Sequence, residues 1–216
     1  NKDAFNFFTE FVMSGDMDMH TAGSLRGGQM VWALAKTNES FDVFGDDKID
    51  SYLLFSNPHQ YGKSIDVRFT PVRVGHRVEF DADSVKETLG LAHEKFQQYK
   101  EMAEFLGSKK YDMESLIQYY NEVFPSTARG DKEESVKVTA DTLSRAAKQS
   151  LAVIETQPGA QYAEGSWWQA LNSVTYITDH VQGRGEDTRL YSNWFGGNQL
   201  RKVRAAEKAV EYATAA

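Results

Sequence analysis

The chain has no cysteine and no long apolar run, and each absence removes a class of function. Without cysteine there is no disulfide, no thiolate metal ligand and no cysteine nucleophile. No apolar stretch approaches the roughly 20 residues that a membrane-spanning helix requires, so we expect no membrane partner. Positive charge is also in deficit, because the formal net charge is −7. A chain this acidic has no general attraction for nucleic acid, and binding to it needs a local group of basic side chains.

Strand patterns dominate the first third of the chain. Residues 17–23 and 29–35 are predicted strands with a Gly-Gly turn between them, which together give a β-hairpin. Residues 52–55 and 65–74 are predicted to form a second hairpin, and polar and apolar residues alternate along its last strand. We therefore predict one antiparallel sheet with one solvent-exposed face. The acidic segment 37–50 is predicted to be a solvated loop.

From residue 84 onward, apolar residues recur at helical spacing. We predict helices at residues 84–106, 116–124, 136–154 and 167–181, with further short helices after Gly185 and one more before the sheet at residues 3–12. Residues 126–134 are predicted to be an exposed linker. The fold class is thus α+β: residues 1–83 form a sheet region with an N-terminal helix, and residues 84–216 form a helical region that packs on it as one folding unit.

One polar cluster lies near the end of the chain and consists of Asp179, His180, Arg184, Asp187 and Arg189. In one interpretation His180 is a general base or a metal ligand. Adjacent residues of a helix point about 100° apart, however, so Asp179 does not face His180. The alternative, which we favour, is a helix-end network that fixes the turn into the last segment.

Other catalytic and metal-binding patterns are missing. The histidines are scattered and none has the spacing of a helical zinc pair, so we expect no metal and no cofactor. Ser24 and Ser166 have glycine neighbours but lie in no Gly-x-Ser-x-Gly elbow. The glycines of residues 23–28 are explained by a hairpin turn, because no Gly-Lys-Ser/Thr follows them.

Basic residues gather on the predicted strands, with a tryptophan among them: Arg26, Trp32, Lys36, Lys63, Arg68, Arg73 and Arg77. A wet sheet face with spaced cations and aromatic rings suits single-stranded nucleic acid, since the cations contact phosphates and the rings stack on bases. The alternative is that these charges only solvate the face and protect the sheet edges.

Several stretches follow one another in the order of a known family's motifs: Thr21-Ala22-Gly23-Ser24-Leu25-Arg26-Gly27-Gly28 with Val31-Trp32-Ala33-Leu34-Ala35, Tyr52-Leu53-Leu54-Phe55-Ser56-Asn57, Val67-Arg68-Phe69-Thr70-Pro71-Val72-Arg73-Val74, and residues 168–180 and 187–196. In these stretches the chain resembles a phage- and plasmid-borne protein family that is classed as a domain of unknown function. The resemblance implies a cytoplasmic protein of a bacterial host cell. Two hairpins followed by a helix also resemble, at fold level only, the core of phage single-strand annealing recombinases of the Red-beta and Erf-like kind.

The chain departs from the family pattern after the Val67–Val74 stretch. Relatives continue with a Cys-Asn-Asn-Thr-type segment and a further helix, whereas Val74 is here joined directly to Gly75. Relatives also carry an N-terminal region, and this chain begins without Met in a predicted helix. We therefore expect that a segment of the natural protein is missing before Asn1. Between Val74 and Gly75, either this member of the family lacks the piece that relatives carry or a segment is missing there, and we favour the second alternative.

Three functional hypotheses remain. In the first, the chain is a nucleic-acid-binding protein of phage or plasmid DNA metabolism that binds or anneals single-stranded DNA as a homo-oligomer. In the second, it is an interaction protein that engages a host partner through its helices. In the third, it is a hydrolase that uses Asp179, His180 and Asp187. No compact catalytic motif supports the third, so we rank binding first and catalysis last.

Overall fold

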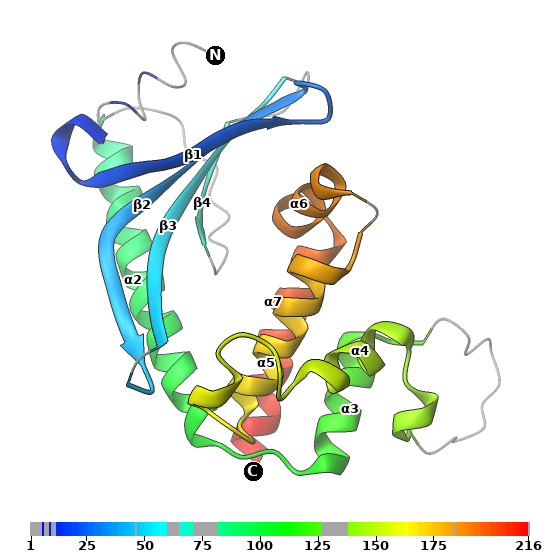
Figure 1. The fold of residues 1–216 in the computed structure, drawn as a ribbon. Helices are drawn as coiled ribbons and strands as arrows, with labels where there is room; N and C mark the ends of the chain where they lie inside the picture. The colour runs from blue at the N-terminus through cyan, green and yellow to red at the C-terminus, as the bar shows by residue number, and fades with distance from the viewer. Residues whose placement is uncertain are drawn as a thin grey trace. The chain divides into compact units, whose positions relative to one another are not determined.

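The computed structural model describes residues 6, 9, 12–45, 47–59, 65–70, 82–126, 138–183 and 185–215, and its fold is drawn in Figure 1. The elements form two compact units, Asn1–Glu101 and Met102–Ala216, which are treated separately below. The predicted boundary between the sheet region and the helical region, at residue 83, lies close to the start of the first long helix at Ala82. The division between the two compact units falls later, inside that helix, after Glu101. The predicted linker and most of the predicted helix at residues 3–12 lie outside the described residues.

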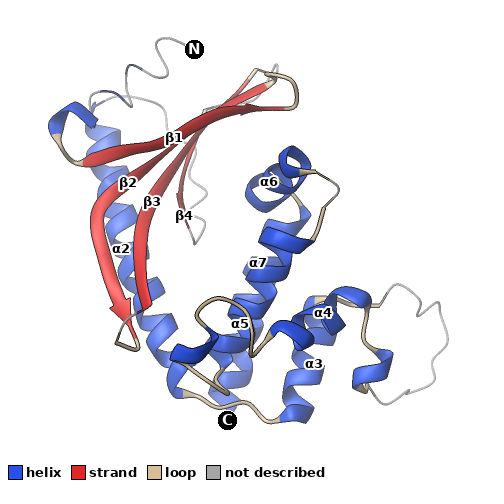
Figure 2. Cartoon of the chain, viewed as in Figure 1, coloured by secondary structure: helices blue, strands red, loops and turns tan. Residues whose placement is uncertain are grey.

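The first unit contains a four-stranded antiparallel sheet in the order β1-β2-β3-β4 (Figure 2). Its strands are β1 (Met17–Leu25), β2 (Met30–Val43), β3 (Asp47–Pro58) and β4 (Asp66–Thr70). The turn between β1 and β2 uses positive φ angles at Arg26, Gly27 and Gly28, which explains the two glycines. The predicted α+β class, with a sheet of hairpins in the first third and helices after it, is confirmed.

The acidic segment 37–50 is not a loop, and the prediction of a solvated loop there is wrong. Strand β2 continues to Val43 and β3 begins at Asp47, so the two strands extend the sheet as a hairpin. Phe41 and Val43 are buried, and the Phe41 ring centroid lies 4.6 Å from that of Phe96 on helix α2 (Ala82–Ser108). The alternation of these apolar residues with exposed polar ones is a strand pattern, which outweighs the high charge of the segment.

Helix α2 covers one face of the sheet. Phe41, which packs on α2, shares this face with a row of small and large apolar side chains on β2 and β3: Ala33, Ala35, Leu53 and Phe55, all of them buried. A second link is made by Glu39, whose carboxylate contacts the His93 ring of α2. The core of the first unit therefore lies mainly between the sheet and α2, while Leu25 and Leu54 are buried on the opposite face, each only 1% exposed.

The second unit is helical. Its helices are α3 (Met113–Val123), α4 (Arg145–Val153), α5 (Trp167–Tyr176), α6 (Glu186–Phe195) and α7 (Gly197–Ala215), with a π-helix at Ile177–Val181. Three helices start at side-chain caps, because Asp112, Ser144 and Ser166 each accept a hydrogen bond from a backbone N–H of the first turn. The Ser144 cap shortens the predicted helix 136–154, and the π-helix replaces the last turn of the predicted helix 167–181.

The core of the second unit is rich in aromatic residues. Tyr119 and Tyr120 are fully buried, and burial raises the pKa of both hydroxyl groups. The Tyr119 hydroxyl donates to the backbone carbonyl of Ala205 at 3.2 Å, which links α3 to α7. The Tyr120 hydroxyl lies 2.6 Å from Ser173 Oγ, which links α3 to α5. No helix in the described part of the chain is both long enough and apolar enough to cross a membrane.

Candidate functional site

The sheet face opposite α2, called here the outer face, carries most of the described basic residues of the sheet. Residues directly opposite each other in an antiparallel pair point to the same side. On β2 the outer face carries Trp32, Leu34 and Lys36, opposite Ser56, Leu54 and Tyr52 of β3. Arg68 of β4 lies opposite Leu54 and so belongs to the same face. The alternation read from the sequence in β4, with Asp66 and Arg68 on one side and Val67 on the other, is confirmed.

The two described cations at the centre of the outer face are paired with carboxylates. Lys36 Nζ lies 2.6 Å from Asp50 Oδ2, and this hydrogen bond raises the pKa of the Lys36 ammonium group. The Arg68 guanidinium contacts Asp66 on the same strand, and these two side chains are only 20% and 21% exposed. The charge of each cation is therefore largely compensated by its carboxylate partner.

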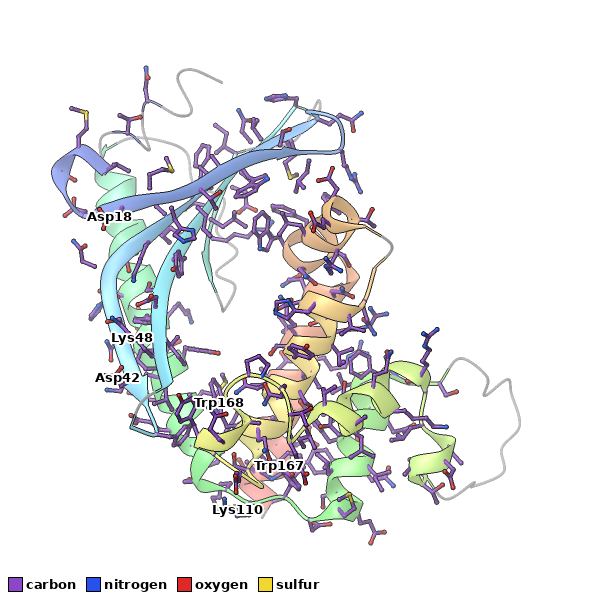
Figure 3. The ribbon with its side chains drawn as sticks, viewed as in Figure 1. Asp18, Asp42, Lys48, Lys110, Trp167 and Trp168 are labelled. Carbon is purple, nitrogen blue, oxygen red and sulfur yellow. The ribbon has the colours of Figure 1, made fainter. Side chains whose placement is uncertain are left out.

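The charges of the whole face are balanced. Asp18 of β1 lies opposite Lys36, and Asp42 of β2 lies opposite Lys48 of β3. Figure 3 labels Asp18, Asp42 and Lys48. Lys48 is well exposed and lies 4.0 Å from Asp50. Among the described residues, four carboxylates thus accompany three cations on the outer face. The face is not a cationic surface, and a polyanion has to compete with carboxylates on it.

Aromatic rings lie among these charges. Trp32 is half-buried, and Tyr52 lies directly opposite Lys36. The His20 ring packs edge-on against Tyr52, with 5.4 Å between the ring centroids. His20 lies two residues after Asp18, so alternation along β1 places it on the outer face, and the pairing of β1 with β2 shifts register beside it, between Met19 and Thr21. The outer face therefore combines three rings with cations at the spacing of adjacent strands.

The Trp32 ring is positioned by Gly23 on β1, its direct partner across the strands. A Cβ atom on residue 23 would lie 2.9 Å from Cζ2 of Trp32, so the ring must move if residue 23 gains a side chain. We expect Gly23→Ala to shift the indole N–H resonance of Trp32 in an NMR spectrum and to destabilise the chain by about 1 kcal/mol. Ser24→Ala, one residue further along β1, is the control and should leave that resonance in place. An unmoved resonance in Gly23→Ala contradicts this packing.

The remaining predicted residues of the basic group are not on the described part of the face. Arg26 lies in the exposed turn between β1 and β2. Lys63, Arg73 and Arg77 lie outside the described residues.

Sequence reasoning missed the carboxylate partners for two reasons. The predicted loop at residues 37–50 includes Asp50, and a loop residue has no cross-strand partner, so the loop prediction excludes the contact with Lys36. Asp66 is predicted on the same face as Arg68, and their spacing of two residues on one strand is the signal that pairs them.

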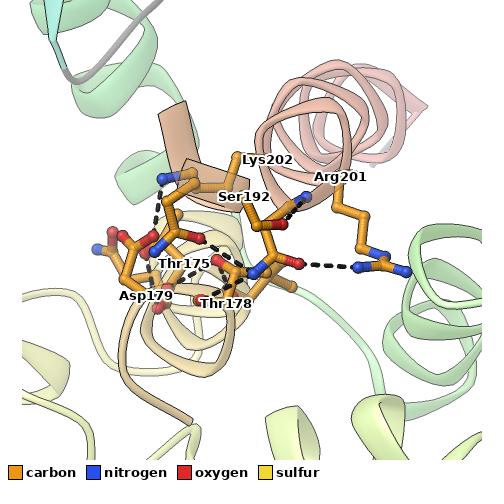
Figure 4. A network of polar contacts seen from close by, with 10 residues as sticks. Thr175, Thr178, Asp179, Ser192, Arg201 and Lys202 are labelled. Carbon is orange, nitrogen blue, oxygen red and sulfur yellow. Dashed lines mark hydrogen bonds and ion pairs between the residues drawn. The ribbon is translucent and has the colours of Figure 1, made fainter. Parts of the chain in front are cut away.

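The polar cluster of the second unit is divided between separate contacts. Asp179 pairs with Lys202 of α7, with 2.7 Å between Oδ1 and Nζ (Figure 4), rather than with His180. His180 is exposed, its ring packs against Tyr176, and its backbone carbonyl accepts a hydrogen bond from Arg189. Asp187 is exposed in the first turn of α6, where its carboxylate interacts favourably with the positive end of the helix dipole. Arg184 lies outside the described residues.

Asn198 connects the π-helix to the two helices that follow it. Its side-chain amide donates to the backbone carbonyl of Thr178 and to Asn193 Oδ1, each at 3.1 Å. Its side-chain oxygen Oδ1 accepts a hydrogen bond from Arg201 at 2.8 Å, and its backbone N–H donates to Ser192 Oγ at 3.2 Å. These contacts fit the helix-end interpretation of the cluster, because each one holds a turn or a helix terminus in place. No group of three or more potential metal ligands occurs among the described residues.

Comparison with known proteins gives a family but no characterised relative. A family model described as a domain of unknown function, DUF932, matches the chain in two stretches, residues 1–75 and 72–215. The two stretches overlap at residues 72–75, which include Val74 and Gly75. No curated protein and no solved structure matches the chain.

Proposed function

The chain belongs to the DUF932 family of domains of unknown function, and we propose that it binds single-stranded nucleic acid through the outer face of its sheet. The observation that carries the proposal is the grouping on one face of three aromatic rings, His20, Trp32 and Tyr52, with the cations Lys36 and Arg68. Single-stranded nucleic acid is bound by surfaces of this kind, in which cations contact the phosphates and aromatic rings stack on the bases.

The setting in phage or plasmid DNA metabolism is part of the same proposal. It rests on the resemblance of the sequence motifs to a phage- and plasmid-borne family and on the analogy drawn from the order of hairpins and helix with single-strand annealing recombinases, and no match to a solved structure adds to that analogy. We propose that the chain acts there as a homo-oligomer in the bacterial cytoplasm, binding or annealing strands. A sheet face that reads backbone charge and base planes has little sequence preference, which suits annealing.

Binding is expected to be weak and sensitive to salt. Each contact between a cation and a phosphate releases a counterion from the strand, so affinity falls as salt rises. The carboxylates of the face and the overall charge of −7 oppose the approach of a polyanion. Measurements therefore have to start at low ionic strength, where electrostatic attraction is least screened.

The proposal is tested by fluorescence anisotropy with a labelled oligothymidylate. Lys36→Ala and Arg68→Ala are each expected to weaken binding by about two- to tenfold, and the double variant by more, because each change removes a phosphate contact. Lys95→Ala is the matched control, since Lys95 lies on α2, which packs against the opposite face of the sheet. The proposal is wrong if the chain does not bind the oligonucleotide at low salt, or if the three variants lose affinity equally.

A further inference from the structure

The cations of the outer face are held by carboxylates before any ligand arrives. Lys36 donates to Asp50 at 2.6 Å, and Arg68 contacts Asp66. An ammonium or guanidinium group has N–H donors beside those that the carboxylate takes, but a phosphate gains the full charge of the cation only by displacing the carboxylate. Its gain is then the difference between two charge-assisted contacts. A single phosphate therefore gains little from either position alone.

The two pairs are spaced so that a chain of phosphates can engage both. Lys36 and Thr70 lie opposite Tyr52 on its two sides, and Arg68 precedes Thr70 by two residues. From the spacing of strands and the rise per residue, the Cα atoms of Lys36 and Arg68 are about 12 Å apart. Lys36 reaches along the strands toward Asp50 and Arg68 reaches the other way toward Asp66, so the two paired charged groups point apart. One phosphate does not contact both in this arrangement, but linked phosphates of one strand can. Once the first contact forms, the second exchange is intramolecular and is favoured by the high local concentration of the next phosphates.

We infer that Asp50 and Asp66 act as competitors that restrict the outer face to chains of linked phosphates and exclude mononucleotides. This inference rests on the proposed function and adds to it a ligand class and the residues that set it. The carboxylates lower affinity for every anion, but only a polyanion recovers the loss by exchanging at both cations. With Asp18 and Asp42, Asp50 and Asp66 also make carboxylates outnumber cations, four to three, on the described part of the face when no strand is bound.

The inference is tested by removing each carboxylate charge and measuring the affinity for the labelled oligothymidylate. Asp50→Asn and Asp66→Asn are each expected to strengthen binding by about two- to fivefold, which is the range of a partly exposed ion pair. The dependence of affinity on salt should steepen in both variants. In the unchanged chain the carboxylate that a phosphate displaces takes up a cation from solution, which offsets part of the counterion release, and an Asn variant has no such carboxylate. The double variant should also bind thymidine monophosphate, measured as a competitor, more tightly than the unchanged chain does.

Asp42→Asn is the matched control. It changes the net charge by the same amount on the same face, but neither Lys36 nor Arg68 is paired with Asp42 in the described structure. If Asp50→Asn and Asp66→Asn strengthen binding no more than Asp42→Asn, the effect is one of net charge and the inference is overturned, while the proposed function stands. If neither the unchanged chain nor the double Asn variant binds the oligonucleotide at low salt, the proposed function itself is overturned.

Discussion

Replacing Trp167 by alanine is expected to lower the free energy of unfolding by about 3–5 kcal/mol, the range for removing a large aromatic side chain from a core. Trp167 is 1% exposed and begins α5. Its ring stacks on Tyr212 of α7, with 5.2 Å between centroids, and packs edge-on against Tyr119 of α3 at 5.5 Å. One side chain thus joins three helices of the second unit, and the cavity that its loss creates cannot be filled by a single neighbour.

The measurement is guanidinium chloride unfolding followed by far-UV circular dichroism. Trp167→Phe should cost less, about 1–2 kcal/mol, because it keeps a ring and removes an indole N–H that has no hydrogen-bond partner in the described structure. Met113→Ala, at a side chain that is 58% exposed, is the neutral control. A loss in Trp167→Ala no larger than that of the control contradicts the three-helix packing.

The helices of the second unit could be read from the sequence because their apolar residues recur over several turns. What periodicity could not show is where a helix changes type or begins late. The stripe that predicts a helix over 136–154 continues through residues that the Ser144 cap keeps out of α4. The π-helix at Ile177–Val181 preserves the buried positions of Ile177 and Thr178 and so leaves no trace in the apolar pattern.

The composition of the candidate site was predicted in part, but its charge balance was not. Alternation along a strand shows which residues share a face, and it placed Arg68 beside Asp66 correctly. The ion pair of Lys36 with Asp50 depends on the register between β2 and β3, which is set by side chains far apart in sequence. The contact of His20 with Tyr52 joins strands that are not neighbours in the sheet, so alternation along either strand alone does not predict it.

The segment around Phe41 shows why charge alone misleads. Four acidic residues between positions 39 and 47 favour a solvated loop when the segment is judged by composition. Phe41 and Val43, however, point to the face covered by α2, while Asp42 between them points away. Successive side chains of a strand point to opposite faces, so the residues on one face can all be charged while the residues on the other face stay buried.

Phe96→Ala is accordingly expected to destabilise the chain by about 3–5 kcal/mol, and Phe41→Ala by about 2–4 kcal/mol. Phe96 is 1% exposed and Phe41 8% exposed, and their rings pack with 4.6 Å between centroids. Because the two rings are each other's neighbours, the double variant should lose less than the sum of the single losses. A coupling of about 0.5–1.5 kcal/mol is expected from an aromatic pair.

Thermal and guanidinium chloride unfolding of the four chains of this cycle provide the measurement, and Asp42→Ala on the same strand is the control. Asp42 is exposed on the outer face, so its replacement should change stability by no more than about 0.5 kcal/mol. A solvated loop at residues 37–50 predicts the opposite pattern, in which Phe41→Ala is as neutral as Asp42→Ala and shows no coupling to Phe96. The cycle therefore decides whether β2 reaches Val43 and whether α2 is fixed against the sheet, on which the separation of the outer face from the core depends.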